Sequence, residues 1–457
     1  MLAIAALSAR ALTEAALADG HQVLALDVFG DVDTQRAAAA WRRVGDCQTD
    51  GQTDGHTDGQ TDGNAQRINQ ALLCAGLQHA ASLGASGWIA GSGFELDPDL
   101  LLAGAAVLPL IGNPAPVWHA VRDPAQFFGC LQAAGLPHPA WRASVPGDSA
   151  PADSAPTDSA PDGAGHWLVK DPGSSGGSAV QHLAQWRRSG LPLPATAYVQ
   201  RLLPGQPVSL TFIANGQRAL VLGANQQQVQ ALAPTDGSPG GGRPFSFAGV
   251  IGPVALPAAA EALLREALDV LVARFQLRGL GSLDALLDGA QIHLLELNPR
   301  PPASLQLYPA VAGHGVVAAH VAACRHGHLP ARWPPGATHR THPAPVRGLA
   351  VVQAPQALQI DGPLSARLAA WPGVQDVPQP GTRLAAGDPL CSLHTSAASA
   401  TAVQAALQVA RARLLQAILT SADPAWPGTA GAPPSPLYPP SLPSPICAPP
   451  LKARPND

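Results

Sequence analysis

The sequence predicts a mixed fold, with an α/β region first and α+β regions after it. Three observations predict it. The chain opens on an alternation of apolar strand, helix and strand, an Asp-Gly turn joins two apolar runs near residue 288, and short strand-like runs follow residue 345. With 457 residues, 46% of them hydrophobic, the chain is long enough to bury one large core, and two or three domain cores are the favoured interpretation.

Composition argues against several classes of partner. The net charge is -4 and Lys and Arg together number only 27, which gives no electrostatic footprint for nucleic acid or an anionic membrane. The sequence shows no secretory leader and no apolar run of about 20 residues. Its six cysteines never form a Cys-x-x-Cys pair, which disfavours a disulfide framework or a structural zinc site. We therefore expect a soluble cytoplasmic protein, with a homodimer as one candidate assembly.

The first 112 residues are predicted to form a doubly wound α/β domain. The apolar run 2–7 precedes a helix over 11–18, and a second strand over 23–26 ends in Asp27. Asp27 stands where such sheets bind ligands, and a residue that caps the next turn is an equally good interpretation. No Gly-x-Gly-x-x-Gly is present, which argues against a dinucleotide site.

The rest of this domain and the C-terminal region follow from similar patterns. A helix over 66–84 and a strand over 87–90 lead into Gly91-Ser-Gly-Phe-Glu95, where a plain tight turn is favoured over a ligand loop. A further helix over 127–134 ends at Gly135. A small β-rich module is predicted from strands at 348–352, 358–360, 374–377 and 390–393 and a helix at 403–419, with a disordered Pro-rich tail from residue 421.

Two polar segments of low complexity interrupt the pattern. Residues 48–63 contain four tetrapeptides of the form Gln-Thr-Asp-Gly, with His in place of Gln in the third, and residues 144–165 repeat Asp-Ser-Ala-Pro. Calcium-binding Gly-Asp repeats need a nonapeptide period and many coils, so disordered insertions are the favoured interpretation.

Polar residues converge on the predicted hairpin. Glu296 and Asn298 are two residues apart on one strand and therefore share a face. If residues 288–290 form the turn, Asp284 lies opposite Leu294, on that same face and diagonal to Glu296. Buried carboxylates repel each other, and Mg²⁺ relieves this because it binds a few protein oxygens and completes its shell with water and phosphates. An ordinary edge hairpin with exposed acids is the alternative.

A second element places a lysine before a flexible loop. Lys170 comes directly after the apolar run 167–169, and a segment rich in small residues follows the lysine. Such a loop lets backbone N–H groups approach phosphate oxygens, and a lysine at the strand end can neutralise them. A simple β-turn is the alternative for the loop by itself. The candidate phosphate ligands are Lys170, Gly173, Ser174, Ser175, Gly176 and Gly177.

A third element is an extended segment that runs into a Pro-Gly turn and then into an alternating strand. Such a segment between two lobes can present backbone groups to adenine, and an ordinary β-turn-β unit is the alternative. Its candidate residues are Gln200, Arg201, Leu202 and Leu203.

Taken in chain order, these elements resemble the ATP-grasp superfamily. Its members carry a strand lysine with a Gly-rich loop, a hinge of the form Gln-(Glu)-x-hydrophobic-x-Gly, and an Asp strand paired with a Glu-x-Asn-x-Arg strand. The matching residues here are Lys170 with its loop, Gln200 to Gly205, Asp284, and Glu296-Leu-Asn298-Pro-Arg300. The resemblance implies a Rossmann-like pre-ATP-grasp domain over 1–112, a two-lobed ATP-grasp domain over 113–330, a β-rich module over 345–420 and a disordered tail over 421–457.

More narrowly, the segments 7–10, 26–31 and 121–124 resemble a bacterial subgroup described as carboligases related to biotin carboxylase, some linked to pterin-type one-carbon cofactor synthesis. Two positions depart from the family pattern. Pro124 stands where many members have a lysine that binds ATP, and Arg201 stands where a hinge glutamate is common. Arg122 is a candidate to replace the missing lysine.

The resemblance implies a ligase that joins a small-molecule carboxylate to an amine through an acyl phosphate. The implied cofactors are ATP and Mg²⁺, or Mn²⁺ in its place. Asp284, Glu296 and Asn298 are implied to hold the metal ion, and Arg300 and Lys170 to offset the charge on the transferring phosphoryl group. A nucleotide-binding module without catalysis is the alternative. The Cys-Arg-His-Gly-His run at 324–328 ends a helical stretch and is interpreted as structural.

Overall fold

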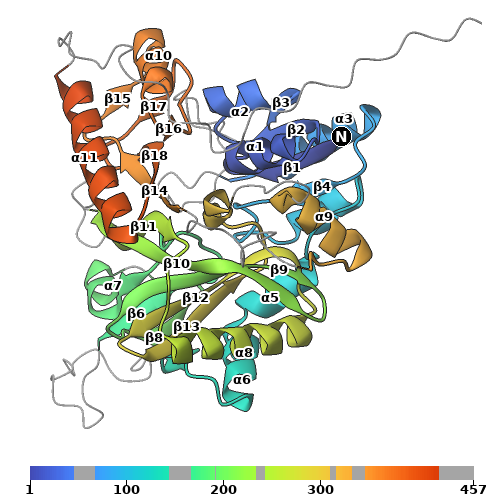
Figure 1. Cartoon of the computed structure of the whole chain (residues 1–457), viewed down its shortest axis with the longest axis vertical. Helices are drawn as coiled ribbons and strands as arrows, with labels where there is room; N and C mark the ends of the chain where they lie inside the picture. Colours follow the sequence, from blue (N-terminus) through green and yellow to red (C-terminus); the bar gives the residue numbers. More distant parts are fainter. Residues whose placement is uncertain are drawn as a thin grey trace, which may run out of the picture.

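In the computed structural model, the described residues form four sheets with helices packed around them (Figure 1). In the residues it describes, every helix is too short or too polar to span a bilayer. The predicted insertions and the tail lie outside the described residues, which are 1–45, 67–143, 166–190, 192–232, 242–308, 315–331 and 345–420.

The N-terminal sheet is parallel and has the strand order β3-β2-β1-β4. Every residue of β1 and β2 is buried, because helices cover both faces of the sheet. This confirms the predicted α/β start. Its elements are β1 (Leu2–Ala6), α1 (Arg10–Ala18), β2 (Val23–Asp27), α2 (Val32–Ala37), β3 (Ala40–Arg43), α3 (Gln70–Ser82), β4 (Trp88–Ala90) and α4 (Leu100–Ala105).

A large sheet of eight strands forms the centre of the protein, in the order β13-β12-β9-β10-β11-β14-β18-β16. Helix α8 (Ala258–Phe275), which the sequence analysis did not predict, packs an apolar stripe against one face of the sheet. The strands are β9 (Gln206–Asn215), β10 (Ala219–Leu232), β11 (Arg243–Gly252), β12 (Arg278–Asp288), β13 (Gln291–Asn298), β14 (Val346–Gln353), β16 (Val374–Gln375) and β18 (Pro389–Ala397).

Three of the C-terminal strands join the central sheet, whereas two others, β15 (Leu358–Gln359) and β17 (Arg383–Leu384), pair only with each other among the described strands. Strand β14 pairs antiparallel with β11, Gly249 lying opposite Ala350, so the ladder continues from the central strands into the C-terminal ones. Without β14, the backbone N–H and C=O groups along β11 would be an unpaired edge. The C-terminal part also contains α10 (Gly362–Ala370) and α11 (Ala400–Leu419).

A small antiparallel sheet, in the order β5-β8-β6-β7, forms a separate lobe. Its strands are β5 (Trp141–Arg142), β6 (Trp167–Lys170), β7 (Gln181–His182) and β8 (Tyr198–Arg201), and α7 (Leu183–Ser189) packs on it. The remaining elements are α5 (Ala115–Arg122), α6 (Pro124–Ala133), the 3-10 helix η1 (Ala303–Leu307) and α9 (Val316–His326).

The chain on both sides of the 48–63 repeat is held together, because Gly45 and Ile68 form an antiparallel bridge and Asn69 N–H donates to Val44 C=O. We expect deletion of residues 48–63 to leave soluble, active protein, since polar repeats add no core and Gly45 and Ile68 pair on either side of the repeat. Solubility, melting temperature and ADP formation check this. Loss of any of them would show that the repeat is integral to the fold.

Candidate functional site

The predicted hairpin is present, but its register differs from the prediction. The predicted three-residue turn is wrong. Asp288 pairs with Gln291, so Gly289 and Ala290 alone form the turn. Gly289 is in the left-handed region, with φ 59°. A bulge then shifts the register beyond Asp284. Asp284 therefore lies directly opposite Glu296 rather than Leu294.

The acidic pair and its neighbour provide an environment suited to a divalent cation. The Oδ1 atom of Asp284 is buried and has no hydrogen-bond partner in the described residues, while Asn298 Nδ2 donates to Oδ2 at 3.4 Å. Burial and then the Glu296 carboxylate raise the pKa of Asp284 to about 7. Desolvation would raise the pKa of Glu296, but Lys170 and Arg122 hold it below its ordinary value.

These three side chains fit Mg²⁺ or Mn²⁺. Within the described ranges, no three His, Cys, Asp or Glu side chains are arranged as a metal site. Two carboxylates and an amide are enough for an ion that takes its other oxygens from water and phosphates. The unpartnered Asp284 oxygen is the acceptor that such an ion would satisfy.

Lys170 faces this acidic pair from the small sheet. It pairs across the strands with Tyr198, and its Nζ lies 3.4 Å from Gln200 Oε1 and 5.9 Å from the centroid of the Tyr198 ring. Burial would lower the pKa of Lys170, but Tyr198 and then Glu296 hold it above its ordinary value. The lysine therefore stays charged between the two sheets.

The loop after Lys170 leaves backbone donors free. Gly176 and Gly177 have φ 62° and 73°, and a Cβ on Gly177 would lie 1.9 Å from Phe245 O, so only glycine fits there. In the described chain the N–H groups of Ser175, Gly176 and Gly177 donate to no other group. Consecutive free N–H groups in this conformation form an anion-binding concavity.

Arg122 holds this loop in place. Its Nε donates to Pro172 O and its Nη2 to Ser174 O, both at 2.5 Å. The next residues start α6: Asp123 caps the helix by accepting from Ala125 N, and Pro124 occupies its first turn. Pro124, at the position where many family members have a lysine that binds ATP, thus begins a helix, and the nearby Arg122 contacts the candidate phosphate loop.

We expect Arg122→Ala to weaken Mg-ATP binding by about 2 kcal/mol, or roughly 30-fold, because the loop loses two charge-assisted hydrogen bonds. Arg122→Lys should recover only part of this, since an ammonium lacks the fork that reaches both carbonyls. Titration calorimetry measures the affinity. Arg413→Ala, an exposed arginine on α11, is the matched control. Wild-type affinity in Arg122→Ala would contradict the positioning role.

Arg300 has a partner that the sequence analysis missed. Its Nε contacts Glu95 Oε1 at 2.5 Å, and Glu95, only 3% exposed, also accepts from Gly93 N at 2.6 Å. Burial would raise the pKa of Glu95, but Arg300 and then Arg122 hold it below its ordinary value. The Gly91–Glu95 turn, favoured above as a plain tight turn, therefore contributes a carboxylate that orients a candidate catalytic residue.

The predicted hinge lies on β8 and beyond it. Gln200 is buried and its Nε2 has no partner in the described chain, while Arg201 is exposed. The N–H groups of Arg201 and Leu202 donate to Ala140 O and His166 O, whereas that of Leu203 donates to no described group. Of the three amides, that of Leu203 is the one available to a nucleotide base.

Other candidates have structural roles. Asp27 accepts from Ala9 N, Gly30 N and Trp41 Nε1, at 3.3, 2.9 and 2.5 Å, so it organises the loops at its strand end. Residues 324–328 close α9, with Gly327 in the left-handed region at φ 66°.

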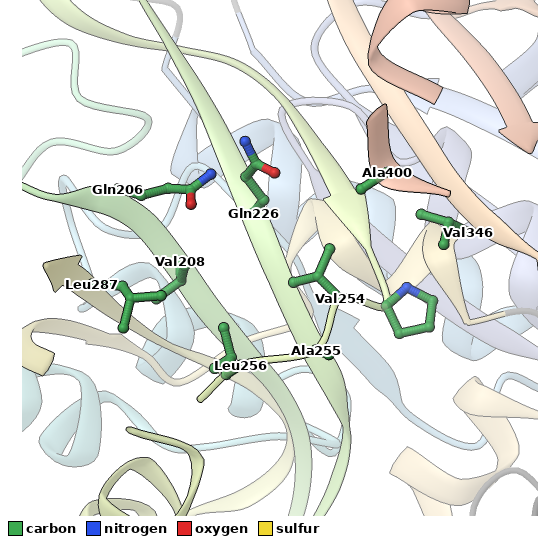
Figure 2. A pocket seen from close by; sticks show the side chains of 10 residues that line it. Gln206, Val208, Gln226, Val254, Ala255, Leu256, Leu287, Val346 and Ala400 are labelled. Carbon is green, nitrogen blue, oxygen red and sulfur yellow. The ribbon is translucent and has the colours of Figure 1, made fainter. Parts of the chain in front are cut away.

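A cavity of about 330 Å³ lies elsewhere (Figure 2). Its lining includes Val208 and Gln226, which alternate with the strand residues that face Asp284 and so point to the other side of the large sheet. This cavity is separate from the acidic site.

Comparisons with known proteins agree with this geometry. Residues 126–304 match a family model described as an ATP-grasp domain. No curated protein sequence matches the chain.

Three solved structures have a similar fold at low sequence identity. Biotin carboxylase from Campylobacter jejuni is 13% identical, with a TM-score of 0.61 over 90% of each chain. L-amino acid ligase from Bacillus licheniformis is 14% identical, with a TM-score of 0.58 over 90% of this chain and 96% of that one. N5-carboxyaminoimidazole ribonucleotide synthetase from Thermus thermophilus is 15% identical, with a TM-score of 0.56 over 91% and 98%.

Proposed function

We propose that this chain, which contains an ATP-grasp domain over residues 126–304 and has a fold similar to that of biotin carboxylase, is an ATP-dependent ligase that joins a carboxylate to an amine. One observation carries the proposal. The unpartnered, buried Oδ1 of Asp284 lies beside Glu296, Lys170 acts on both carboxylates, and the loop with free amides follows Lys170. This arrangement suits a metal-bound triphosphate between the two sheets.

The proposed reaction has two steps. An oxygen of the substrate carboxylate forms a bond to the γ-phosphorus of ATP, the bond from that phosphorus to the bridging oxygen breaks, and ADP leaves. The amine nitrogen then attacks the acyl carbon of the acyl phosphate, the carbon–oxygen bond breaks, phosphate leaves, and the nitrogen loses a proton. A divalent ion at this site supplies charge neutralisation on the phosphates.

Each candidate site residue has a defined role in this reaction. Asp284, Glu296 and Asn298 would hold the ion, and Lys170 with the amides of residues 175–177 would bind phosphate oxygens. Glu95 fixes the Arg300 guanidinium at the edge of the site, where it offsets charge on the transferring group. A site built of donors already in place stabilises the transition state without reorganisation.

We further propose a small-molecule carboxylate and a small-molecule amine as substrates. The names of the similar structures, a carboxylase, an amino acid ligase and a ribonucleotide synthetase, fit this class. A role in pterin-type one-carbon cofactor synthesis is the narrower proposal, and the resemblance of segments 7–10, 26–31 and 121–124 to that bacterial subgroup supports it.

The test is release of ADP from Mg-ATP in the presence of pooled carboxylates and pooled amines. ADP formation that needs both pools supports the ligase. ATP binding without ADP formation in any pool would favour the non-catalytic module instead, and mass spectrometry of the product mixture would identify the bond formed.

A further inference from the structure

A second polar cluster lies where the N-terminal sheet meets the C-terminal strands. We call it the junction cluster and define it as Arg10, Glu14, Asp31, Asp33 and Asp376. The first four lie at the carboxyl ends of β1 and β2 or on the helices that follow, and Asp376 follows β16, which lies next to α2 in Figure 1. A hydrogen bond from Val32 N to Val377 O, 2.8 Å long, joins the two parts directly.

Arg10 is the cation at the centre of the cluster and is fully engaged. It is 1% exposed, and its Nε donates to Asp376 at 2.7 Å. Its Nη1 donates to Glu14 and Gln375, and its Nη2 to Gln306 and to the second oxygen of Asp376. All five N–H donors of the guanidinium therefore have acceptors within the protein. Arg10 has no donor left for an anionic ligand.

Two of the carboxylates are also held by the protein. Asp33 accepts from the backbone N–H groups of Asp376 and Val377, at 2.7 and 3.1 Å. Asp376 accepts from Ser392 Oγ as well as from Arg10. These bonds fix the geometry of the cluster, but four carboxylates still surround a single cation.

Asp31 is the carboxylate without a partner. It is 6% exposed, and in the described part of the chain its side chain accepts no hydrogen bond, although it stands at the N-cap position of α2. The charged groups that act on it are the carboxylates of Asp376, Asp33 and Asp27 and the guanidinium of Arg10. A buried carboxylate beside other carboxylates is costly unless a cation joins them.

We propose that the junction cluster binds a protonated primary amine of a small-molecule ligand, with Asp31 as its principal partner. An ammonium group offers three N–H donors, which suits several separate carboxylate oxygens. The Asp33 and Asp376 side chains are 17% and 28% exposed, so the cluster opens to solvent.

The cluster is connected to the proposed ATP site. Arg10 donates to Gln306 at 2.6 Å, and Gln306 lies in η1, which begins three residues after Arg300. Resting on the function proposed above, we assign this ammonium to the amine substrate, as a second amino group that stays protonated while the first one reacts. The substrate class is then a diamine or another amine with a second basic group.

The experiment measures binding of 1,4-diaminobutane in the absence of nucleotide, by thermal shift and titration calorimetry on the full chain. We expect saturable stabilisation of the wild-type protein and at least a tenfold loss of affinity in Asp31→Asn. Asp269→Asn, an exposed aspartate on α8, should bind as the wild type does. Without ligand, Asp31→Asn should melt no lower than the wild type, because it removes repulsion and no hydrogen bond.

Absence of binding to the wild type, or equal binding by Asp31→Asn, would overturn the proposal. Stabilisation by MgCl₂ that depends on Asp31, with none by the diamine, would also overturn it in favour of a metal site. Because the assay contains no ATP, its result is independent of whether the chain forms ADP, so the failure of either proposal can be told from the failure of the other.

Discussion

Glu296→Ala is expected to abolish ADP formation while leaving the protein folded. The substitution removes one of two carboxylates that face each other across β12 and β13, and with it a ligand of the proposed metal ion. Loss of such charge stabilisation raises the barrier by at least about 3 kcal/mol, a rate loss of more than roughly a hundredfold. Steady-state ADP release measures the effect.

The controls separate catalysis from folding. Glu296→Ala removes repulsion from Asp284 but also the attraction of Lys170 and Arg122, so the melting temperature should fall only slightly and the melting transition should stay cooperative. Glu266→Ala, an exposed glutamate on α8, should behave as the wild type in both assays. Wild-type turnover in Glu296→Ala would contradict the role of Glu296 as a metal ligand, whatever the melting temperature of the variant.

Lys170→Gln is expected to weaken Mg-ATP binding by about 1.5–3 kcal/mol, or roughly ten- to 150-fold, because a charge-assisted phosphate contact is lost from a partly dry site. A surface lysine would tolerate the change within about half a kcal/mol. The two results differ enough for titration calorimetry to distinguish them, and turnover should fall in parallel.

Lys170→Arg keeps the charge and should retain part of the affinity. The melting temperature of each variant controls for folding. Unchanged affinity and turnover in Lys170→Gln would mean that the loop after Lys170 does not bind phosphate. The β12–β13 hairpin would then be the remaining evidence for a nucleotide site.

Local patterns predicted much of this fold. The opening β-α-β unit, the hairpin and the short C-terminal strands all follow from apolar periodicity and from turn residues close to each other in the chain. The match to the ATP-grasp family confirms the prediction made from Lys170, its loop and the Glu-x-Asn-x-Arg strand. The role of each of these residues remains a prediction that the substitutions above test.

Long-range pairings could not be predicted in the same way. Glu95 and Arg300 are separated by 205 residues, and Arg10 and Asp376 by 366, so no periodicity relates them. The hairpin register was missed for a different reason. The bulge at Asp284 adds one residue to one strand and so changes which side chains lie opposite each other. Its position depends on pairing with the neighbouring strand, which local sequence patterns do not reveal.

The continuous ladder from β13 to β16 has a consequence for motion. Rotation of the C-terminal strands as a separate body would break the backbone hydrogen bonds between β11 and β14, so both belong to one rigid unit. The four-stranded sheet that carries Lys170 is joined to this unit by few contacts, among them the bond from Phe247 N to Gly176 O. If a nucleotide binds between the two sheets as proposed, we expect the small lobe to move against this rigid unit when it encloses the ligand.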